Sequence, residues 1–226
     1  MNIQQDKKKQ DLGQDPVIEG VVKAKEFMVS NSTALIISLA AVVIIVVGVL
    51  VVGKMKESSI RKAQEIFGVA MLDHNDNQLD KALNAFSDVA NNYRHTPQGT
   101  MSAFMMGSIY LQQQNYDQAI TWFETALSGK DAGFAGAQAL EGLASAYEFK
   151  GDMTSALNYL QKALNDDRLK HRHSAIRWKM ALINQNSNTA VSGKLCNEII
   201  ADTNATEYHQ KAENLLAILN VKAGVN

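Results

Sequence analysis

The stretch that decides the fold of this 226-residue chain is MGSIYLQQQNYDQAITWFETAL, residues 106–127. The same arrangement returns 37 positions later as LASAYEFKGDMTSALNYLQKAL, residues 143–164. The matching pairs are Met106 and Leu143, Gly107 and Ala144, Tyr110 and Tyr147, Ala119 and Ala156, Phe123 and Leu160, and Ala126-Leu127 and Ala163-Leu164. Apolar residues recur at helical spacing on both sides of a short polar turn, so each copy predicts a helix–turn–helix unit. No useful length alternates with period two, and we therefore expect an all-α fold.

This pattern resembles the tetratricopeptide repeat, in which a small residue lies where two helices touch, a Tyr follows one turn later and an Ala opens the second helix. We expect Gly107 to let Ala119 approach closely, with Tyr110 filling the space beside them. The turns QNYDQ and KGDMT supply Asn115 and Gly151 where the first helix of each unit must stop. The resemblance implies an α-solenoid, in which helix pairs stack along the chain.

Weaker copies extend the array in both directions. Before the clear repeats, Phe67-Gly68 and Met71 precede Ala82 and Phe86, which predicts a copy with about two extra residues in its turn. After them, Met180-Ala181 lies 37 residues beyond Leu143-Ala144, with a second helix over roughly 189–202. A final helix at about 207–222 carries its apolar residues on one face, as a solenoid cap should: Ala212, Leu215, Leu216 and Leu219.

The N-terminal region contains a segment suited to a membrane. No residue is charged from Phe27 to Gly53, and 14 of the 20 residues from Ala34 to Gly53 are Leu, Ile or Val. A 20-residue helix is about 30 Å long, which matches the hydrocarbon core of a bilayer. The run is too long for a signal-peptide core and no A-x-A cleavage site follows, so we expect a single uncleaved transmembrane helix.

The residues before this segment predict a tail and a short helix. Residues 1–14 are polar and lack periodicity, which predicts disorder. Asp15-Pro16 is typical of a helix start, and apolar residues at helical spacing follow it, so we expect an amphipathic helix beside the membrane. The sequence thus predicts a tail with this helix at 1–32, a transmembrane helix at 33–53 and a repeat domain at 54–226.

Composition argues against several functions. The chain has 22 basic and 23 acidic residues, so no strong field attracts nucleic acid. Cys196 is the single cysteine, and we expect it to be a small buried residue. His171 and His173 lie in a basic loop without further ligands, which does not predict a metal site. No phosphate loop or catalytic constellation is recognisable, so we expect no enzyme activity, cofactor or small-molecule substrate.

The concave face of the predicted solenoid is the expected binding site, because the first helix of each repeat lines it in tetratricopeptide arrays. The positions on this face are Met101, Phe104, Ser108, Leu111, Gln138, Glu141, Ser145, Glu148, Phe149, Trp178 and Leu182, with Lys62, Glu65, Val69 and Leu72 in the first copy. Chaperone-tail receptors of this class clamp a carboxylate with Lys and Asn where this chain has Phe104 and Ser108. We expect instead an apolar, weakly basic peptide, although some of the aromatic residues could only pack against the next repeat.

The order of these parts resembles the YfgM-like family of bacterial inner-membrane proteins. The resemblance rests on EGVVKAKEFMVSN (19–31), the apolar segment and SSIRKAQEIF (58–67). It implies a cytoplasmic tail and a periplasmic repeat domain. It also implies that the protein associates with the Sec translocon beside a membrane-bound periplasmic chaperone, and that it binds these proteins or unfolded clients. Two alternatives stay open: a scaffold for another cell-envelope assembly, and a cytoplasm-facing adaptor. Lys54, Lys56, Arg61 and Lys62 favour the adaptor by the positive-inside rule.

Overall fold

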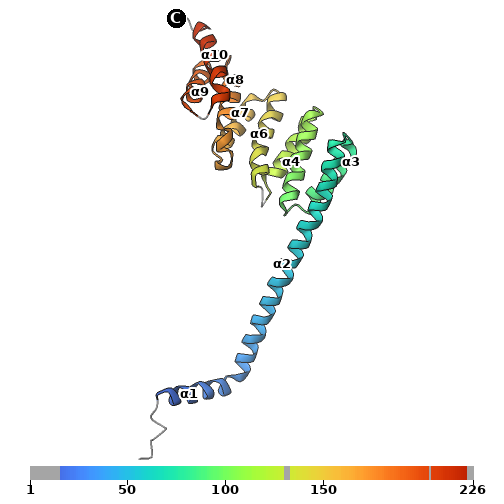
Figure 1. Cartoon of the computed structure of the whole chain (residues 1–226), viewed down its shortest axis with the longest axis vertical. Coiled ribbons are helices and arrows are strands. Elements are labelled where there is room, and N and C mark those ends of the chain that lie inside the picture. The colour runs from blue at the N-terminus through green and yellow to red at the C-terminus, as the bar shows by residue number, and fades with distance from the viewer. Residues whose placement is uncertain (1–15, 130–132, 204, 223–226) are drawn as a thin grey trace, which may run out of the picture. The chain divides into compact units, whose positions relative to one another are not determined.

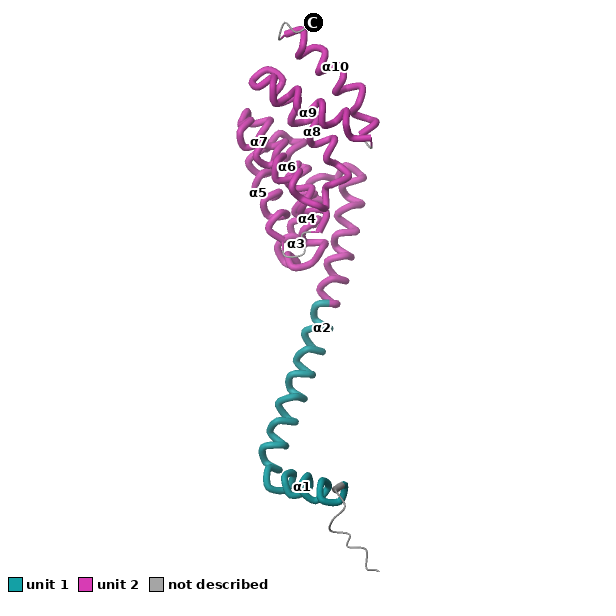
Figure 2. The backbone as a smooth tube through the Cα atoms, turned by 90° about the vertical axis from the view of Figure 1, so that its left-hand side faces the viewer, with its two compact units in different colours: residues 1–56 teal, residues 57–226 magenta. Residues whose placement is uncertain are grey.

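The computed structural model describes residues 16–129, 133–203 and 205–222, and every regular element within them is helical (Figure 1). The elements are α1 (Pro16–Ser30), α2 (Ser32–Asn75), α3 (Leu79–Asn92), α4 (Pro97–Gln112), α5 (Tyr116–Leu127), α6 (Gly133–Phe149), α7 (Met153–Leu164), the 3-10 helix η1 (Asp167–Arg172), α8 (His173–Asn184), α9 (Thr189–Ala201) and α10 (Thr206–Lys222). The prediction of an all-α repeat fold after one long apolar helix is confirmed. The chain forms two compact units, residues 1–56 and 57–226 (Figure 2).

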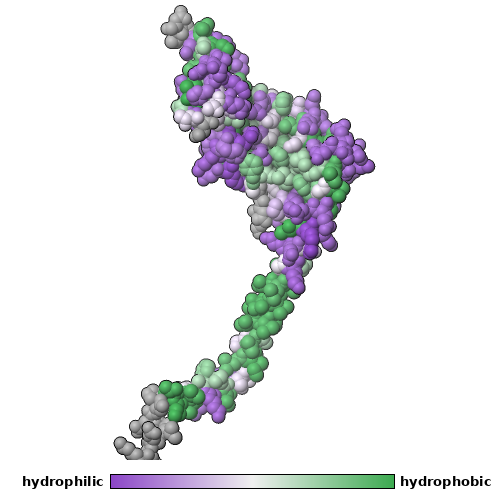
Figure 3. Space-filling view, viewed as in Figure 1, coloured by the Kyte–Doolittle hydropathy of each residue, from purple (hydrophilic) through white to green (hydrophobic). Residues whose placement is uncertain are grey.

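Unit 1 contains α1 and the apolar part of α2. Helix α1 begins at Pro16 as predicted, while residues 1–15 lie outside the described part of the chain. Helix α2 carries an 18-residue apolar stretch of which no part is buried, and Figure 3 shows it as a continuous hydrophobic surface. In water such a surface is unfavourable over its whole length, whereas in lipid it needs no protein partner. By length and composition, this helix can cross a membrane.

Unit 2 stacks helix pairs in chain order. Helix α4 packs against α5, α5 against α6, and α6 against α7, and the series continues through α8, α9 and α10. Helix α4 begins at Pro97 because Thr96 caps it: the Thr96 hydroxyl accepts a hydrogen bond from the Gly99 N–H at 3.1 Å. Of the four residues expected on the apolar face of the last helix, Ala212, Leu215 and Leu219 of α10 are buried, and Leu216 is partly buried against the core.

The turns within the first three helix pairs share one geometry at intervals of 37 residues. Asn77, Gln114 and Gly151 each adopt a left-handed conformation, with φ of 58°, 59° and 85°. In the second turn the Asn115 N–H donates to Tyr110 O and the Gln114 N–H to Leu111 O, which is a Schellman motif. Asn115 therefore does not stop the helix, contrary to the expectation from the sequence. It caps the N-terminus of α5 by accepting from the Gln118 N–H, and Asp152 caps α7 in the same way.

This shared geometry corrects the predicted register of the first repeat. Ala70 is fully buried and lies 37 residues before Gly107. Gly68 is exposed instead, and a Cβ atom added to it would contact nothing within 4 Å. The Phe67 and Phe86 rings pack at 5.6 Å, as Phe104 and Phe123 do at 5.7 Å. The first turn thus has no extra residues, and the four face positions expected for this copy are two residues out of register. A shift of two residues rotates a helix face by about 200°.

The second of these turns yields a stability prediction. Replacing Gln114 with Gly should raise the free energy of unfolding by about 1 kcal/mol, because a side chain is strained at positive φ and glycine is not. Thermal unfolding of the full chain, followed by circular dichroism, should show a Tm higher by about 2–4 °C. The matched control is Gly151→Gln at the equivalent position, which should lower Tm by a similar amount. A Tm for Gln114→Gly at or below that of the wild type would contradict the assigned turn.

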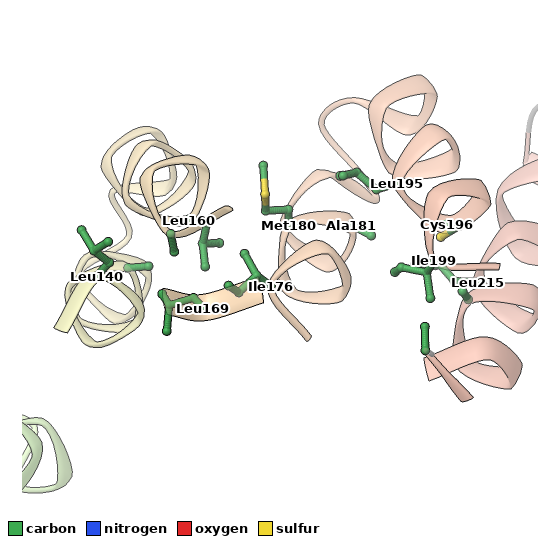
Figure 4. Packing of buried hydrophobic residues seen from close by; sticks show 14 of the residues in the cluster. Leu140, Leu160, Leu169, Ile176, Met180, Ala181, Leu195, Cys196, Ile199 and Leu215 are labelled. Atoms are coloured by element: carbon green, nitrogen blue, oxygen red, sulfur yellow. The ribbon is translucent and has the colours of Figure 1, made fainter. Parts of the chain in front are cut away.

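The core of unit 2 contains two clusters of buried side chains. The N-terminal cluster includes Phe86, Ile109, Phe123 and Leu143. The C-terminal cluster joins α6 to α10 through buried residues that Figure 4 labels: Leu140, Leu160, Leu169, Ile176, Met180, Ala181, Leu195, Cys196, Ile199 and Leu215. Cys196 is fully buried, as predicted, and burial raises the pKa of its thiol.

Phe123 is the central side chain of the N-terminal cluster. A Cβ atom added to Gly107 of α4 would lie 2.7 Å from the Phe123 ring, and one added to Gly142 of α6 would lie 2.6 Å from it. The two glycines therefore make room for the ring from both neighbouring helices. The sequence predicts that Gly107 makes room for Ala119, but the three atoms nearest to a Cβ atom added at Gly107 all belong to the Phe123 ring. This close packing fixes the spacing of α4 and α6, which form the site described next.

Candidate functional site

A cleft of about 250 Å³ is lined by residues of α4, α5, α6 and η1. Its lining consists of Phe104, Ser108, Leu111, Phe123, Gln138, Glu141, Gly142, Ser145 and Arg172. Six of these residues belong to the predicted face: Phe104, Ser108, Leu111, Gln138, Glu141 and Ser145. They come together because α4 packs against α6 and the 37-residue period places equivalent positions of the two helices side by side.

The base of the cleft is apolar and its hydroxyl groups are oriented by their own helices. The half-buried Phe104 ring packs against the buried Phe123 ring, and Gly142 adds no side chain beside them. The Ser108 hydroxyl donates to Phe104 O at 3.0 Å, and the Ser145 hydroxyl donates to Glu141 O at 2.9 Å. Because each serine proton is already donated, the oxygen lone pairs of Ser108 stay available to accept a hydrogen bond from a ligand.

The carboxylate of Glu141 is paired with Arg172. Arg172 donates from Nε to Glu141 Oε1 at 2.5 Å and from Nη2 to Oε2 at 3.0 Å, so the contact is bidentate. The hydrogen bond to Glu141 raises the pKa of the Arg172 guanidinium. Both side chains are partly buried, with 20% of Glu141 and 40% of Arg172 exposed.

The second carboxylate of this face, Glu148, is paired with Lys179 of α8. The Lys179 ammonium lies 3.0 Å from Glu148 Oε2 and donates to the Ser145 hydroxyl at 2.7 Å. The negative charges of the two carboxylates are therefore balanced by the positive charges of Arg172 and Lys179. The expectation of a weakly basic ligand depends on carboxylates without partners, and the structure pairs both of them.

The other predicted face residues lie outside the lining of the cleft: Met101, Glu148, Phe149, Trp178 and Leu182. Phe149 is 62% exposed and stacks on Tyr116 of α5 at 5.7 Å. Trp178 packs against the C-terminal core cluster, so it serves at least in part as a contact with neighbouring helices. Met101 is half-buried and Leu182 is exposed.

Phe123, Gly142 and Arg172 line the cleft, and Lys179 pairs with Glu148 outside its lining, but the sequence did not predict any of these four as face residues. The sequence places Arg172 in a solvated basic loop, but residues Asp167–Arg172 form the 3-10 helix η1, which packs on the core through the buried Leu169.

The two histidines of this region form no metal site with the other described residues. His171 packs against the Phe134 ring at 5.4 Å, and burial lowers the pKa of His173. Among the described residues, no three or more His, Cys, Asp or Glu side chains form a group that could hold a metal ion.

The comparison with known proteins defines the class of this repeat unit. Residues 99–168 match the tetratricopeptide repeat family, and this range runs from α4 into η1 and includes most of the cleft. No curated protein sequence matches the chain. The chain thus contains tetratricopeptide repeats, which serve as protein-interaction scaffolds in other proteins.

Proposed function

We propose that this chain is a membrane-anchored protein-binding scaffold, in which the apolar part of α2 is the anchor and the cleft on α4 and α6 is the binding site. The observation that carries the proposal is the cleft itself, because it combines an apolar base with oriented hydroxyl groups, and six of its lining residues are positions that the repeat spacing predicts to face a bound protein. Anchoring raises the effective concentration of the site at the membrane, so a weak contact with a membrane-bound partner suffices.

In its finer form, the proposal assigns the chain to the YfgM-like family as an ancillary subunit of the Sec translocon or of a periplasmic chaperone network. Residues 1–32 are then a cytoplasmic tail, 33–53 span the bacterial inner membrane and 54–226 lie in the periplasm. The segments EGVVKAKEFMVSN and SSIRKAQEIF on either side of the apolar stretch support this assignment. The partners are the translocon, a membrane-bound chaperone or unfolded polypeptides.

A second candidate is a scaffold for another membrane-associated assembly, with its repeats in the cytoplasm. Lys54, Lys56, Arg61 and Lys62 follow the apolar stretch closely, and positive charge favours the cytoplasmic side. The effect of such charges is small when a whole domain follows the span. A fusion of an export-dependent enzyme after Asn226 separates the two candidates, because the enzyme is active only in the periplasm.

Site-specific photocrosslinking tests the binding function. A photoreactive residue at Leu111, inside the cleft, should form adducts with a small set of proteins in intact membranes. The same residue at Val69, which is exposed on α2 outside the cleft, serves as the matched control and should form few of these adducts. Translocon or chaperone subunits among the Leu111 adducts would support the finer proposal. Identical adduct patterns from both positions would count against the cleft as the binding site.

A further inference from the structure

We propose that the cleft selects uncharged polypeptide segments and that Arg172 and Lys179 set this selectivity. The inference rests on the proposed function of the cleft as a polypeptide-binding site. It begins from the charge pattern: Glu141 and Glu148 each have a basic partner from a different part of the chain. Neither partner belongs to the helix positions that line tetratricopeptide grooves by their spacing, so the sequence period does not account for the pairing.

The Glu141–Arg172 pair leaves little for a charged ligand to bind. Both carboxylate oxygens of Glu141 accept from Arg172, so an incoming ammonium group would have to displace the guanidinium or share its acceptors. An incoming carboxylate would approach Arg172 only beside the charge of Glu141. A ligand charge that loses its water without gaining a partner is strongly disfavoured in a partly buried site.

Lys179 has the same effect near the C-terminal end of α6. Its ammonium group contacts both the Glu148 carboxylate and the Ser145 hydroxyl. One cation therefore neutralises the charge of Glu148 and donates a hydrogen bond to a residue that lines the cleft. Lys179 and Glu148 are each about one third exposed, which keeps the pair accessible to solvent but within reach of a ligand. The face is neutral as a whole, and no net field attracts a ligand of either sign.

The groups that remain match an uncharged extended chain. Phe104 and Leu111 offer apolar surface to side chains, while the Ser108 oxygen and the Gln138 amide can bond to peptide N–H and C=O groups. Segments of this kind are exposed by unfolded or newly translocated polypeptides. The charge complementarity of the cleft is therefore with a neutral, mainly apolar segment.

Binding of three synthetic peptides to the full chain in nanodiscs tests the inference. The peptides share leucine-flanked sequences and differ only in a central Gln, Lys or Glu, and fluorescence anisotropy with empty nanodiscs as the blank gives each Kd. The wild type should bind the Gln peptide about tenfold more tightly than the Lys or Glu peptide. Arg172→Gln should shift the preference to the Lys peptide, and Glu141→Gln should shift it to the Glu peptide. The double variant should restore the preference for Gln.

The matched control is Arg177→Gln, which removes an arginine that pairs with Glu198 outside the cleft and should leave all three Kd values unchanged. Equal affinity of the wild type for the three peptides overturns the selectivity and leaves the proposed function standing. The selectivity is also overturned if the single variants retain the wild-type order of affinities while their circular dichroism shows intact folding. Failure of all three peptides to bind overturns the proposed function together with this inference.

Discussion

Replacing Phe123 with alanine is expected to lower the free energy of unfolding of the repeat unit by about 3–5 kcal/mol. The ring is 1% exposed and lies between Gly107 and Gly142, so its removal leaves a cavity that rigid helices on both sides cannot fill. Urea denaturation of the full chain in detergent micelles, followed by circular dichroism, should show a lower midpoint with an unchanged m-value.

The matched control for this variant is Phe149→Ala, the same substitution at a ring that is 62% exposed. It loses one stacked contact with Tyr116 and should cost about 1 kcal/mol or less. Gly142→Ala should also destabilise the unit, by about 1–3 kcal/mol, because the added Cβ atom overlaps the Phe123 ring. Similar costs for Phe123→Ala and Phe149→Ala would contradict the packing around Phe123.

The repeat period predicted the fold well because each repeat must bury the same contact. Gly107 and Ala144 place a small residue at that contact in the two clear copies, and their separation of 37 residues gives the length of the repeat. The first repeat was misplaced because Phe67-Gly68 resembles Met106-Gly107 but lies two positions away from the true equivalent. The sequence offers two small residues here, Gly68 and Ala70, and only the burial of Ala70 shows that Ala70 lies on the helix face that contacts the next helix.

The cleft was predictable as far as it repeats. Phe104 and Glu141 occupy equivalent positions of α4 and α6, as Ser108 and Ser145 do, so periodic counting found them. Arg172 could not be found in this way, because it lies in a 3-10 helix that interrupts the helical period. Its partner is 31 residues earlier in the chain, and a single sequence does not pair them. The charge state of the site therefore depended on contacts that periodicity does not encode.

The largest expected effect of all concerns the apolar part of α2. Replacing Leu39 and Val42 together with arginine should move much of the protein from the membrane to the soluble fraction. Each arginine near the centre of a span costs about 2.5–3.5 kcal/mol, and the 14 Leu, Ile and Val residues of residues 34–53 together favour insertion by about 4–8 kcal/mol. Two arginines nearly cancel that preference, so comparable amounts of protein should appear in both fractions after alkaline extraction.

The control uses the same helix and the same pair of residue types. Val69 and Leu72 are also three positions apart on α2 and are 56% and 65% exposed, close to the values for Val42 and Leu39. Val69→Arg with Leu72→Arg adds the same charge outside the apolar stretch and should leave the protein fully in the membrane fraction. If the first double variant stayed in the membrane as fully as the second, anchoring would have to come from α1 or from a bound partner. Release of both variants alike would show instead that added charge, independent of its position along α2, weakens the association.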